Sequence, residues 1–196
     1  MSPPGAAFAL EFRALHRSAR VAIVANPYPA VGLGESVTDI AVLVATGASP
    51  TTPDVYDRSV AAGLRWLSSE IRSQVAGCPA TQLLLTGYSQ GAEVAADTYQ
   101  REIPQSERIH IRALVLFGDP LFNPADTRTD RGGYLPSHGG LLGLRPSFGG
   151  DPRVLSYCHL HDPICQRPTL AQALLYGLAQ HRNYGPDGAA AAARYR

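Results

Sequence analysis

The chain has 196 residues, of which 45% are apolar and 17% charged, a composition typical of one globular domain with a sizeable core. A formal net charge of +1 excludes the basic stripe of a nucleic-acid-binding protein, so no nucleic-acid partner is expected. No apolar run approaches the roughly 20 residues of a membrane-spanning helix, and no signal peptide is visible at the N-terminus.

The first half of the chain contains helix and strand signals in alternation. Apolar residues at helical spacing predict an amphipathic helix at residues 6–17, and a β-branched run predicts a short strand at residues 21–25. Residues 30–53 hold glycines, prolines and one apolar run, and are assigned only as a loop with a short helix. Apolar residues that step by three and four from Val60 to Val75 predict a long helix, which a Gly-Cys-Pro sequence ends.

The second half continues this alternation and adds one long connection. Strands are predicted at residues 83–85, 111–117 and 153–157, and helices from residue 92, at residues 170–181 and at residues 187–195. Residues 118–152 are rich in Gly, Pro and Asp and are expected to form an ordered loop over one end of the sheet. This order predicts an α/β fold: one domain, with a parallel sheet, helices on both faces and catalytic groups at the carboxyl ends of the strands.

A G-x-S-x-G pattern with Ser89 at its centre lies between a predicted strand and a predicted helix. Gly87 and Gly91 are expected to leave room for a sharp turn that holds Ser89 in a strained backbone conformation. The turn would present the hydroxyl at the carboxyl edge of the sheet, and the backbone amide of Gln90 could donate to an oxyanion. The flanking strand and helix favour a nucleophile over a chance match in a glycine-rich loop.

A serine nucleophile needs a base, and the base needs a carboxylate that orients it. The aspartates between Ser89 and the last histidine are Asp119, Asp126, Asp130, Asp151 and Asp162. Asp162 is the leading candidate, because it follows a predicted strand and lies between two cysteines. Asp119 also follows a strand and is the second candidate, with a turn residue before proline as the structural alternative.

Among the six histidines, His181 is the best candidate for the base, because it follows the candidate acids in the chain. His159 and His161 flank Asp162 too closely to meet it from a separate loop. A metal site at this H-x-H-D sequence has no further ligand motif to support it, so no metal or cofactor is expected. No sequence feature marks the remaining three, which are His16, His110 and His138.

Several motifs together resemble those of the cutinase family of serine esterases. They are G-Y-S-Q-G-A at residues 87–92, F-G-D-P-L-F-N-P at 117–124, Y-C-x-x-x-D-P-I-C at 157–165 and H-x-x-Y-G-P-D at 181–187. The resemblance covers most of the chain and implies an α/β-hydrolase-like fold with a five-stranded parallel sheet. It also implies ester hydrolysis with Ser89 as nucleophile, Asp162 as acid, His181 as base and Gln90 as one oxyanion donor, in a secreted protein.

The cysteines support this resemblance, and the start of the chain departs from it. Cys158 and Cys165 are expected to form a disulfide that limits how far Asp162 can move from His181. Cys78 resembles a cysteine whose usual partner lies in a first strand that is not found here. The domain is therefore expected to be truncated at its N-terminus, without the family's oxyanion loop, and to be poorly soluble and weakly active as given.

The function expected from these features is hydrolysis of carboxylic esters, such as cutin-like polyesters or short to medium acyl esters. Deacetylation of acetylated polysaccharide and lipase or phospholipase activity use the same triad and remain open. A non-catalytic remnant or surface-binding module is the alternative of another class, because the second oxyanion donor is missing; residues 30–53 are where a substitute would be sought. The protein is expected to act as a monomer on an ester substrate.

Overall fold

A computed structural model describes residues 2–33, 36–46, 53–126 and 130–195, and its centre is a parallel sheet of four strands. The strands are β1 (Leu83–Tyr88), β2 (Ile111–Phe117), β3 (Asp130–Arg131) and β4 (Val154–Tyr157), in the spatial order β1-β2-β4-β3. Tyr88 pairs with Phe117, and Phe117 pairs with Tyr157. The three long strands therefore end in register, and the segments that follow them meet at one edge of the sheet.

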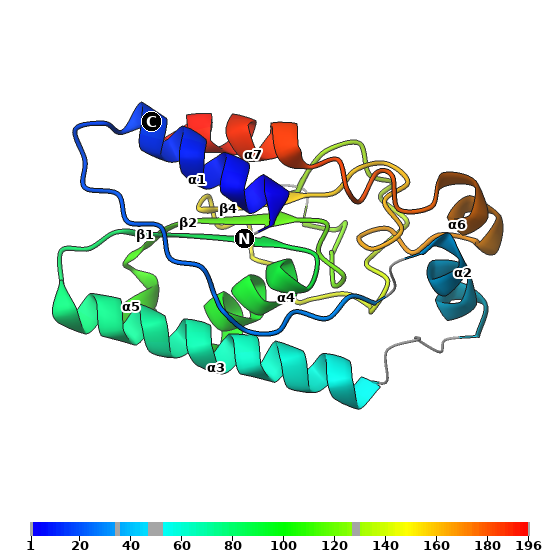
Figure 1. Ribbon diagram of the computed structural model, residues 1–196, viewed down its shortest axis with the longest axis horizontal. Helices are drawn as coiled ribbons and strands as arrows, with labels where there is room; N and C mark the ends of the chain where they lie inside the picture. The colour runs from blue at the N-terminus through cyan, green and yellow to red at the C-terminus, as the bar shows by residue number, and fades with distance from the viewer. Residues whose placement is uncertain (1, 34–35, 47–52, 127–129, 196) are drawn as a thin grey trace.

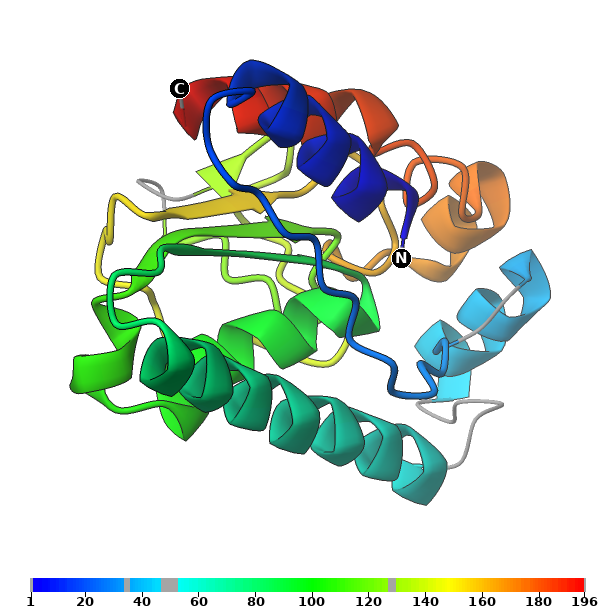
Figure 2. The ribbon, with the colours of Figure 1, turned by 60° about the vertical axis from the view of Figure 1, so that its left-hand side comes forward.

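One face of the sheet is covered by the helices that surround the predicted strand-turn-helix (Figure 1). These are α3 (Pro53–Gly77), α4 (Gln90–Asp97), the π-helical turn η1 (Thr98–Glu102) and α5 (Gln105–Arg108). Ile71 of α3 and the small residues of α4 pack with Leu114 of β2 in the largest apolar cluster on this side. The alanines of α4 let this helix lie close to the sheet, with α3 outside it (Figure 2).

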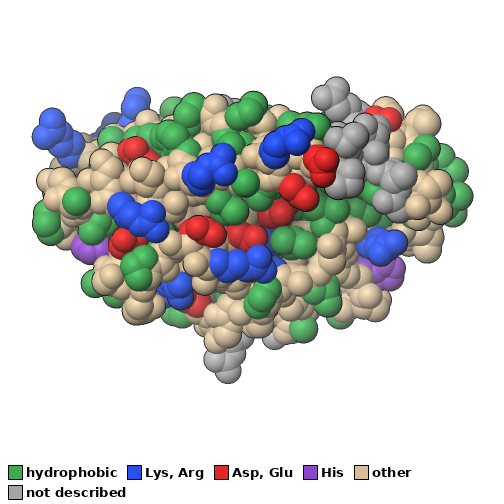
Figure 3. Space-filling view, turned by 90° about the horizontal axis from the view of Figure 1, so that it is seen from below, with side chains coloured by type: hydrophobic (Ala, Val, Ile, Leu, Met, Phe, Trp, Pro, Cys, Tyr) green, Lys and Arg blue, Asp and Glu red, His purple; other side chains and the backbone are tan. Residues whose placement is uncertain are grey.

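The opposite face is covered by the two ends of the described chain, α1 (Pro3–Leu15) and α7 (Gly185–Ala192), with the 3-10 turn η2 (Ala193–Tyr195) after α7 (Figure 1). Phe8 of α1 packs with Phe117 of β2 and Tyr184 in the apolar cluster on this side. The helix predicted at residues 6–17 is thus present, beginning three residues earlier. On the face that carries α3, acidic and basic side chains are interspersed (Figure 3).

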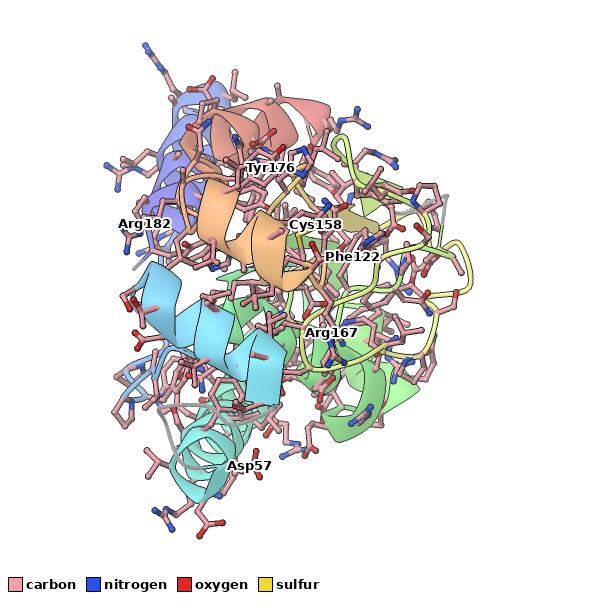
Figure 4. All side chains as sticks on the ribbon, turned by 90° about the vertical axis from the view of Figure 1, so that its right-hand side faces the viewer. Asp57, Phe122, Cys158, Arg167, Tyr176 and Arg182 are labelled. Atoms are coloured by element: carbon pink, nitrogen blue, oxygen red, sulfur yellow. A yellow bond between two sulfur atoms is a disulfide. The ribbon has the colours of Figure 1, made fainter. Side chains whose placement is uncertain are left out.

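Two short helices, α2 (Val37–Thr46) and α6 (Leu170–Tyr176), pack together beyond the carboxyl end of the sheet (Figure 4). Thr169 caps α6 through a capping box with Gln172. Gly177, with a φ of 53°, ends α6 five residues before the predicted end at residue 181. The chain can therefore turn back toward the sheet before it reaches His181.

Residues 21–25 are not a strand, so that prediction was wrong. They belong to no strand of the sheet, and the side chain of Val24 is 55% exposed. A β-branched run becomes a strand only where a neighbouring strand satisfies its backbone, and none of the described residues pairs with this one. The fourth strand is instead β3, in the long connection where no strand was predicted, and the described sheet has four strands rather than the five that the resemblance implied.

Candidate active site

Ser89 lies at the turn between β1 and α4 with φ 55° and ψ −125°, a conformation that costs a non-glycine residue free energy. Its backbone N–H donates to the carbonyl of Phe117 at 2.9 Å, which ties the turn to the end of β2. A Cβ on Gly87 would lie 2.0 Å from the carbonyl oxygen of Gly91, so only glycine fits there. A Cβ on Gly91 would have Tyr28 Oη as its nearest neighbour at 3.8 Å. Of the two glycines that the turn was expected to need, the packing therefore requires Gly87 and not Gly91.

Gln90 is the first residue of α4, so its backbone N–H has no acceptor within the helix. Its side chain is buried, and Oε1 accepts hydrogen bonds from Val31 N at 2.9 Å and Ser59 Oγ at 3.0 Å. The side chain thus anchors the chain near Val31 against α3. The backbone N–H of Gln90 lies at the turn beside Ser89.

Residues 30–53 are the segment in which a second oxyanion donor is expected, and residues 34–35 and 47–52 of it lie outside the described residues. Val31, in the described part of this segment, donates its N–H to the side chain of Gln90. Val31 in this conformation therefore does not supply the second donor.

Asp162 and His181 form a buried pair: the side chain of Asp162 is 0% exposed and that of His181 8%. His181 Nδ1 lies 3.0 Å from both carboxylate oxygens, and the backbone N–H of Ile164 donates to Oδ1 at 2.8 Å. Burial opposes ionisation of Asp162, but the interaction with His181 and the hydrogen bonds it receives lower its pKa below the ordinary value. The pair leaves His181 Nε2 on the opposite side of the ring, where it could accept a proton.

The loop that carries Asp162 is closed by the disulfide between Cys158 and Cys165, as the sequence predicted. The cysteines are seven positions apart, and both are fully buried against Phe122. Phe122 and Cys158 are labelled beside α6 in Figure 4. Cys78, at the end of α3, is exposed and forms no disulfide within the described part of the chain.

Two tyrosines complete the surroundings of this pair, and sequence reasoning gave neither of them a role. Tyr184 Oη donates to Asp162 Oδ2 at 2.6 Å and accepts from the backbone N–H of His159 at 2.9 Å. Burial and the neighbouring Asp162 raise the pKa of Tyr184 well above its ordinary value, so the phenol keeps its proton. The signal that could have found Tyr184 is the H-x-x-Y-G-P-D motif, in which the tyrosine stands three residues after His181.

Tyr88 connects the histidine to the serine turn. Its ring stacks on His181 with 4.8 Å between the ring centroids, and Ser89 is the next residue along the chain. The stacking therefore brings the imidazole beside the turn. No hydrogen bond joins Ser89 Oγ to His181 within the described residues; such bonds are often long before substrate binds.

Gly118 supports the pair from the end of β2. Its φ is +59°, and a Cβ there would lie 2.7 Å from His181 Cε1 and 3.0 Å from Asp162 Oδ2. Only glycine can therefore bring the backbone this close to both side chains. Ser89, Gly118 and Asp162 follow three different strands, and all three lie at the same edge of the sheet.

Asp119, the second candidate for the acid, makes no hydrogen bond with His181 within the described residues. Its carboxylate binds the guanidinium of Arg145 through both oxygens, and its Oδ1 also accepts from Leu121 N. Of the other aspartates, Asp151 binds Arg153 and Tyr99. Asp126 accepts from Phe148 N, and Asp130 lies in β3.

The remaining histidines have other neighbours in the described structure. His159 Nε2 lies 2.7 Å from Asp187 Oδ2, and His161 stacks on Tyr176. His138 Nδ1 lies 2.9 Å from Ser137 Oγ in an exposed loop. His16 and His110 approach backbone carbonyls of Phe12 and Thr81. No cluster of three His, Cys, Asp or Glu side chains in the described ranges could hold a metal ion.

A cavity of about 390 Å³ lies at the same end of the molecule, between Ser36 and the end of α6. Its apolar lining includes Leu174, Leu175 and Leu178, and Arg182 adds a cation next to His181 in the chain. Tyr176 and Arg182, which also line the cavity, are labelled in Figure 4. Within the described residues, none of the helices is both long and apolar enough to cross a bilayer.

Comparisons with curated proteins give relatives that are esterases by name. The Carboxylesterase Culp1 of Mycobacterium tuberculosis is 34% identical over 112 residues, which are 57% of this chain and 47% of that protein. A Cutinase of Monilinia fructicola is 29% identical over 131 residues, which are 67% of this chain and 52% of that protein. The chain thus spans about half the length of these curated relatives.

Solved structures and a family model agree with this result. The catalytic core domain of acetyl xylan esterase from Trichoderma reesei matches with a TM-score of 0.66 at 22% identity, over 96% of this chain and 88% of that chain. A Trichoderma reesei cutinase in complex with a phosphonate inhibitor matches with a TM-score of 0.58 at 24% identity, over 95% of this chain and 64% of that chain. These likenesses establish an α/β-hydrolase-like fold. Because the family model described as Cutinase matches residues 1–196, the chain belongs to the cutinase family.

Proposed function

We propose that this protein hydrolyses carboxylic esters through an acyl-enzyme, with Ser89, His181 and Asp162 as its triad. The observation that carries the proposal is the buried hydrogen-bonded pair of His181 and Asp162, which Tyr88 links to the strained turn at Ser89. Family membership adds to this, since the named relatives include a carboxylesterase and a cutinase.

In the proposed reaction Ser89 Oγ attacks the ester carbonyl while His181 Nε2 accepts the hydroxyl proton. Asp162 holds the imidazole tautomer and stabilises the imidazolium that forms. The N–H of Gln90 donates to the oxyanion. The alcohol leaves with the proton from His181. Water then attacks the acyl-enzyme with His181 as base, the bond between the acyl carbon and Ser89 Oγ breaks, and Oγ regains its proton from His181 as the carboxylic acid leaves.

The substrate is proposed to be an ester with an apolar acyl or alcohol part. Leucines of α6 line the cavity next to Arg182, and Leu174 and Leu175 are 59% and 73% exposed. Such side chains suit a polyester or lipid chain better than a sugar. An acetylated polysaccharide remains the second candidate, because acetylxylan esterase 2 of Talaromyces purpureogenus is 28% identical over 152 residues. We also propose a secreted location, where the Cys158–Cys165 disulfide would persist.

Hydrolysis of 4-nitrophenyl esters of increasing chain length, with acetylated xylan beside them, tests the activity and ranks the substrates. Ser89→Ala should lower turnover by at least about 10³-fold and abolish fluorophosphonate labelling. Ser137→Ala is the matched control, because Ser137 also lies beside a histidine but in an exposed loop. Hydrolysis by Ser89→Ala at the wild-type rate would refute the assignment, and a wild type that neither reacts with fluorophosphonate nor hydrolyses ester would point to a non-catalytic remnant.

The identity of the acid is tested by a pair of substitutions. Asp162→Asn should lower kcat by about 10⁴-fold, because the amide favours the wrong imidazole tautomer. Asp119→Asn should cost far less, because Asp119 binds Arg145 rather than His181. If the ranking is reversed in steady-state kinetics, the acid is Asp119.

A further inference from the structure

Arg145 is a buried cation that the proposed reaction does not use. It lies in the long connection between β2 and β4, and its side chain is 2% exposed. Nε and Nη2 donate to the two oxygens of Asp119, and Nη1 donates to Asp97 Oδ1 at 3.0 Å. One guanidinium therefore binds two carboxylates that are themselves buried.

The two carboxylates belong to the two halves of the candidate site. Asp97 is the last residue of α4, the helix that begins directly after Ser89. Asp119 is next to Gly118, whose backbone packs against His181 and Asp162. Arg145 thus joins the helix of the nucleophile to the turn beneath the base and the acid.

The geometry of this connection is rigid because the guanidinium is planar and binds Asp119 as a fork. A second contact joins the same two segments: Ser89 N donates to the carbonyl of Phe117. Together they hold the segment 117–119 against both ends of α4. A buried ion pair is weak evidence for stability, because apolar residues of similar size often stabilise a fold equally well. The role of Arg145 is therefore better explained by the segments whose relative position it fixes.

We propose that Arg145 is a positioning residue for the ester hydrolysis proposed above: by binding Asp97 and Asp119 together, it fixes the Gly118 turn relative to α4. The Gly118 turn then holds His181 in a fixed position relative to the helix that follows Ser89. The expected effect on catalysis rests on the proposed function, whereas the expected effect of Arg145 on the position of the Gly118 turn does not. Loss of the connection should lower kcat more than it changes KM, because it disturbs the reacting groups and leaves the α6 cavity untouched.

The test compares Arg145→Lys with Arg153→Lys. Lysine keeps the charge and loses the fork, and Arg153 makes a similar fork with Asp151 at the start of β4, away from the site. With 4-nitrophenyl butyrate, Arg145→Lys should lower kcat at least about tenfold with KM within about twofold, and Arg153→Lys should change neither beyond about twofold. A kcat of Arg145→Lys within twofold of wild type, or a loss in KM alone, would overturn the proposal.

A second measurement does not depend on activity. Hydrogen–deuterium exchange of peptides that span residues 86–97 and 117–121 should rise at least about tenfold in Arg145→Lys and stay unchanged in Arg153→Lys. Equal exchange in both variants refutes the inference even if the wild type is an esterase. Raised exchange in Arg145→Lys, with a wild type that hydrolyses no ester, refutes the proposed function and leaves the mechanical link.

If Arg145→Lys does not fold, Asp97→Ala gives the same test with a smaller change. It cuts the connection to α4 and leaves the fork between Arg145 and Asp119 intact. Arg101→Gln is its control, because Arg101 binds the other oxygen of Asp97 from an exposed position. The proposal predicts the tenfold loss of kcat for Asp97→Ala alone and fails if both variants behave as wild type.

Discussion

Tyr184 donates a hydrogen bond of 2.6 Å to Asp162, on the carboxylate that also faces His181. The phenol is fully buried and stacks on His159, so it is held in place from two sides. The carboxylate therefore has its oxygens fixed by a side chain as well as by the N–H of Ile164. A fixed carboxylate holds the imidazole in one orientation.

Tyr184→Phe removes this hydrogen bond and keeps the ring. We expect kcat to fall about tenfold with little change in KM, and the free energy of unfolding to fall by about 1–3 kcal/mol, because the lost bond is to a charged group. Steady-state kinetics and urea unfolding measure both. Tyr157→Phe is the control, because Tyr157 is also buried and stacks on Phe117 without a hydrogen bond to Asp162 in the described structure. Equal kcat values for the two variants would contradict the role of Tyr184.

Gly118→Ala should displace His181, because the new methyl group would lie 2.7 Å from its ring. Gly149→Ala is the matched control: Gly149 has a similar φ of +65°, and a Cβ there meets nothing within 4 Å. Both substitutions should destabilise the fold by about 1 kcal/mol through backbone strain. Only Gly118→Ala should lower ester turnover. A similar turnover in both would show that the contact with His181 relaxes without consequence.

Glu93 should make stability depend on pH. It is 8% exposed in α4, and burial raises its pKa to about 7, with Tyr56 opposing and Asp119 adding to the shift. Between pH 4.5 and about 7 the folded state keeps a proton that the unfolded chain releases, so the free energy of unfolding falls as pH rises through this window, by about 3 kcal/mol in all.

Glu93→Gln removes the titration, so this part of the pH dependence should disappear. Urea unfolding at pH 5 and pH 8 should then give more similar free energies for the variant than for the wild type. Glu102→Gln, at an exposed position after α4, should keep the wild-type dependence. Parallel curves for wild type and Glu93→Gln would show that Glu93 is ionised throughout.

The disulfide should matter for turnover as well as stability. Alkylation of the unfolded protein without reductant should modify Cys78 alone, and reduction should expose all three cysteines. Reduction should cost about 2 kcal/mol of stability and lower kcat several-fold, because the loop that holds Asp162 is then no longer closed. Cys78→Ser should respond to reductant as the wild type does. Alkylation of Cys158 and Cys165 without reductant would contradict the pairing.

The parts of the fold that sequence predicted are those with a local signal. The apolar steps of α3, the buried run of β2 and the glycine-flanked turn at Ser89 each carry their cause within a few residues. Residues 21–25 failed because strand formation needs a partner that lies elsewhere in the chain. The short β3 carries no hydrophobic run at all and depends on pairing with β4.

In the candidate site too, sequence identified the residues that belong to motifs and missed those that only the fold brings together. Chain order and motif selected Asp162 and His181, which are 19 positions apart, and the structure places them in contact. Arg145 binds Asp119 across 26 positions and Asp97 across 48, through the course of a long connection whose path no periodicity describes. The assignment of Asp162 and His181 as catalytic groups stays a prediction.

The position of β1 at the side of the sheet has a consequence for how activity would be lost on heating. Within the described residues β1 hydrogen-bonds to β2 alone, whereas β2 has a strand on each side. A strand held from one side opens in local fluctuations that cost less than global unfolding. Because β1 leads directly into Ser89, warming should disable the nucleophile while the rest of the sheet remains folded. The temperature of half-inactivation should therefore lie below the midpoint of thermal unfolding followed by circular dichroism.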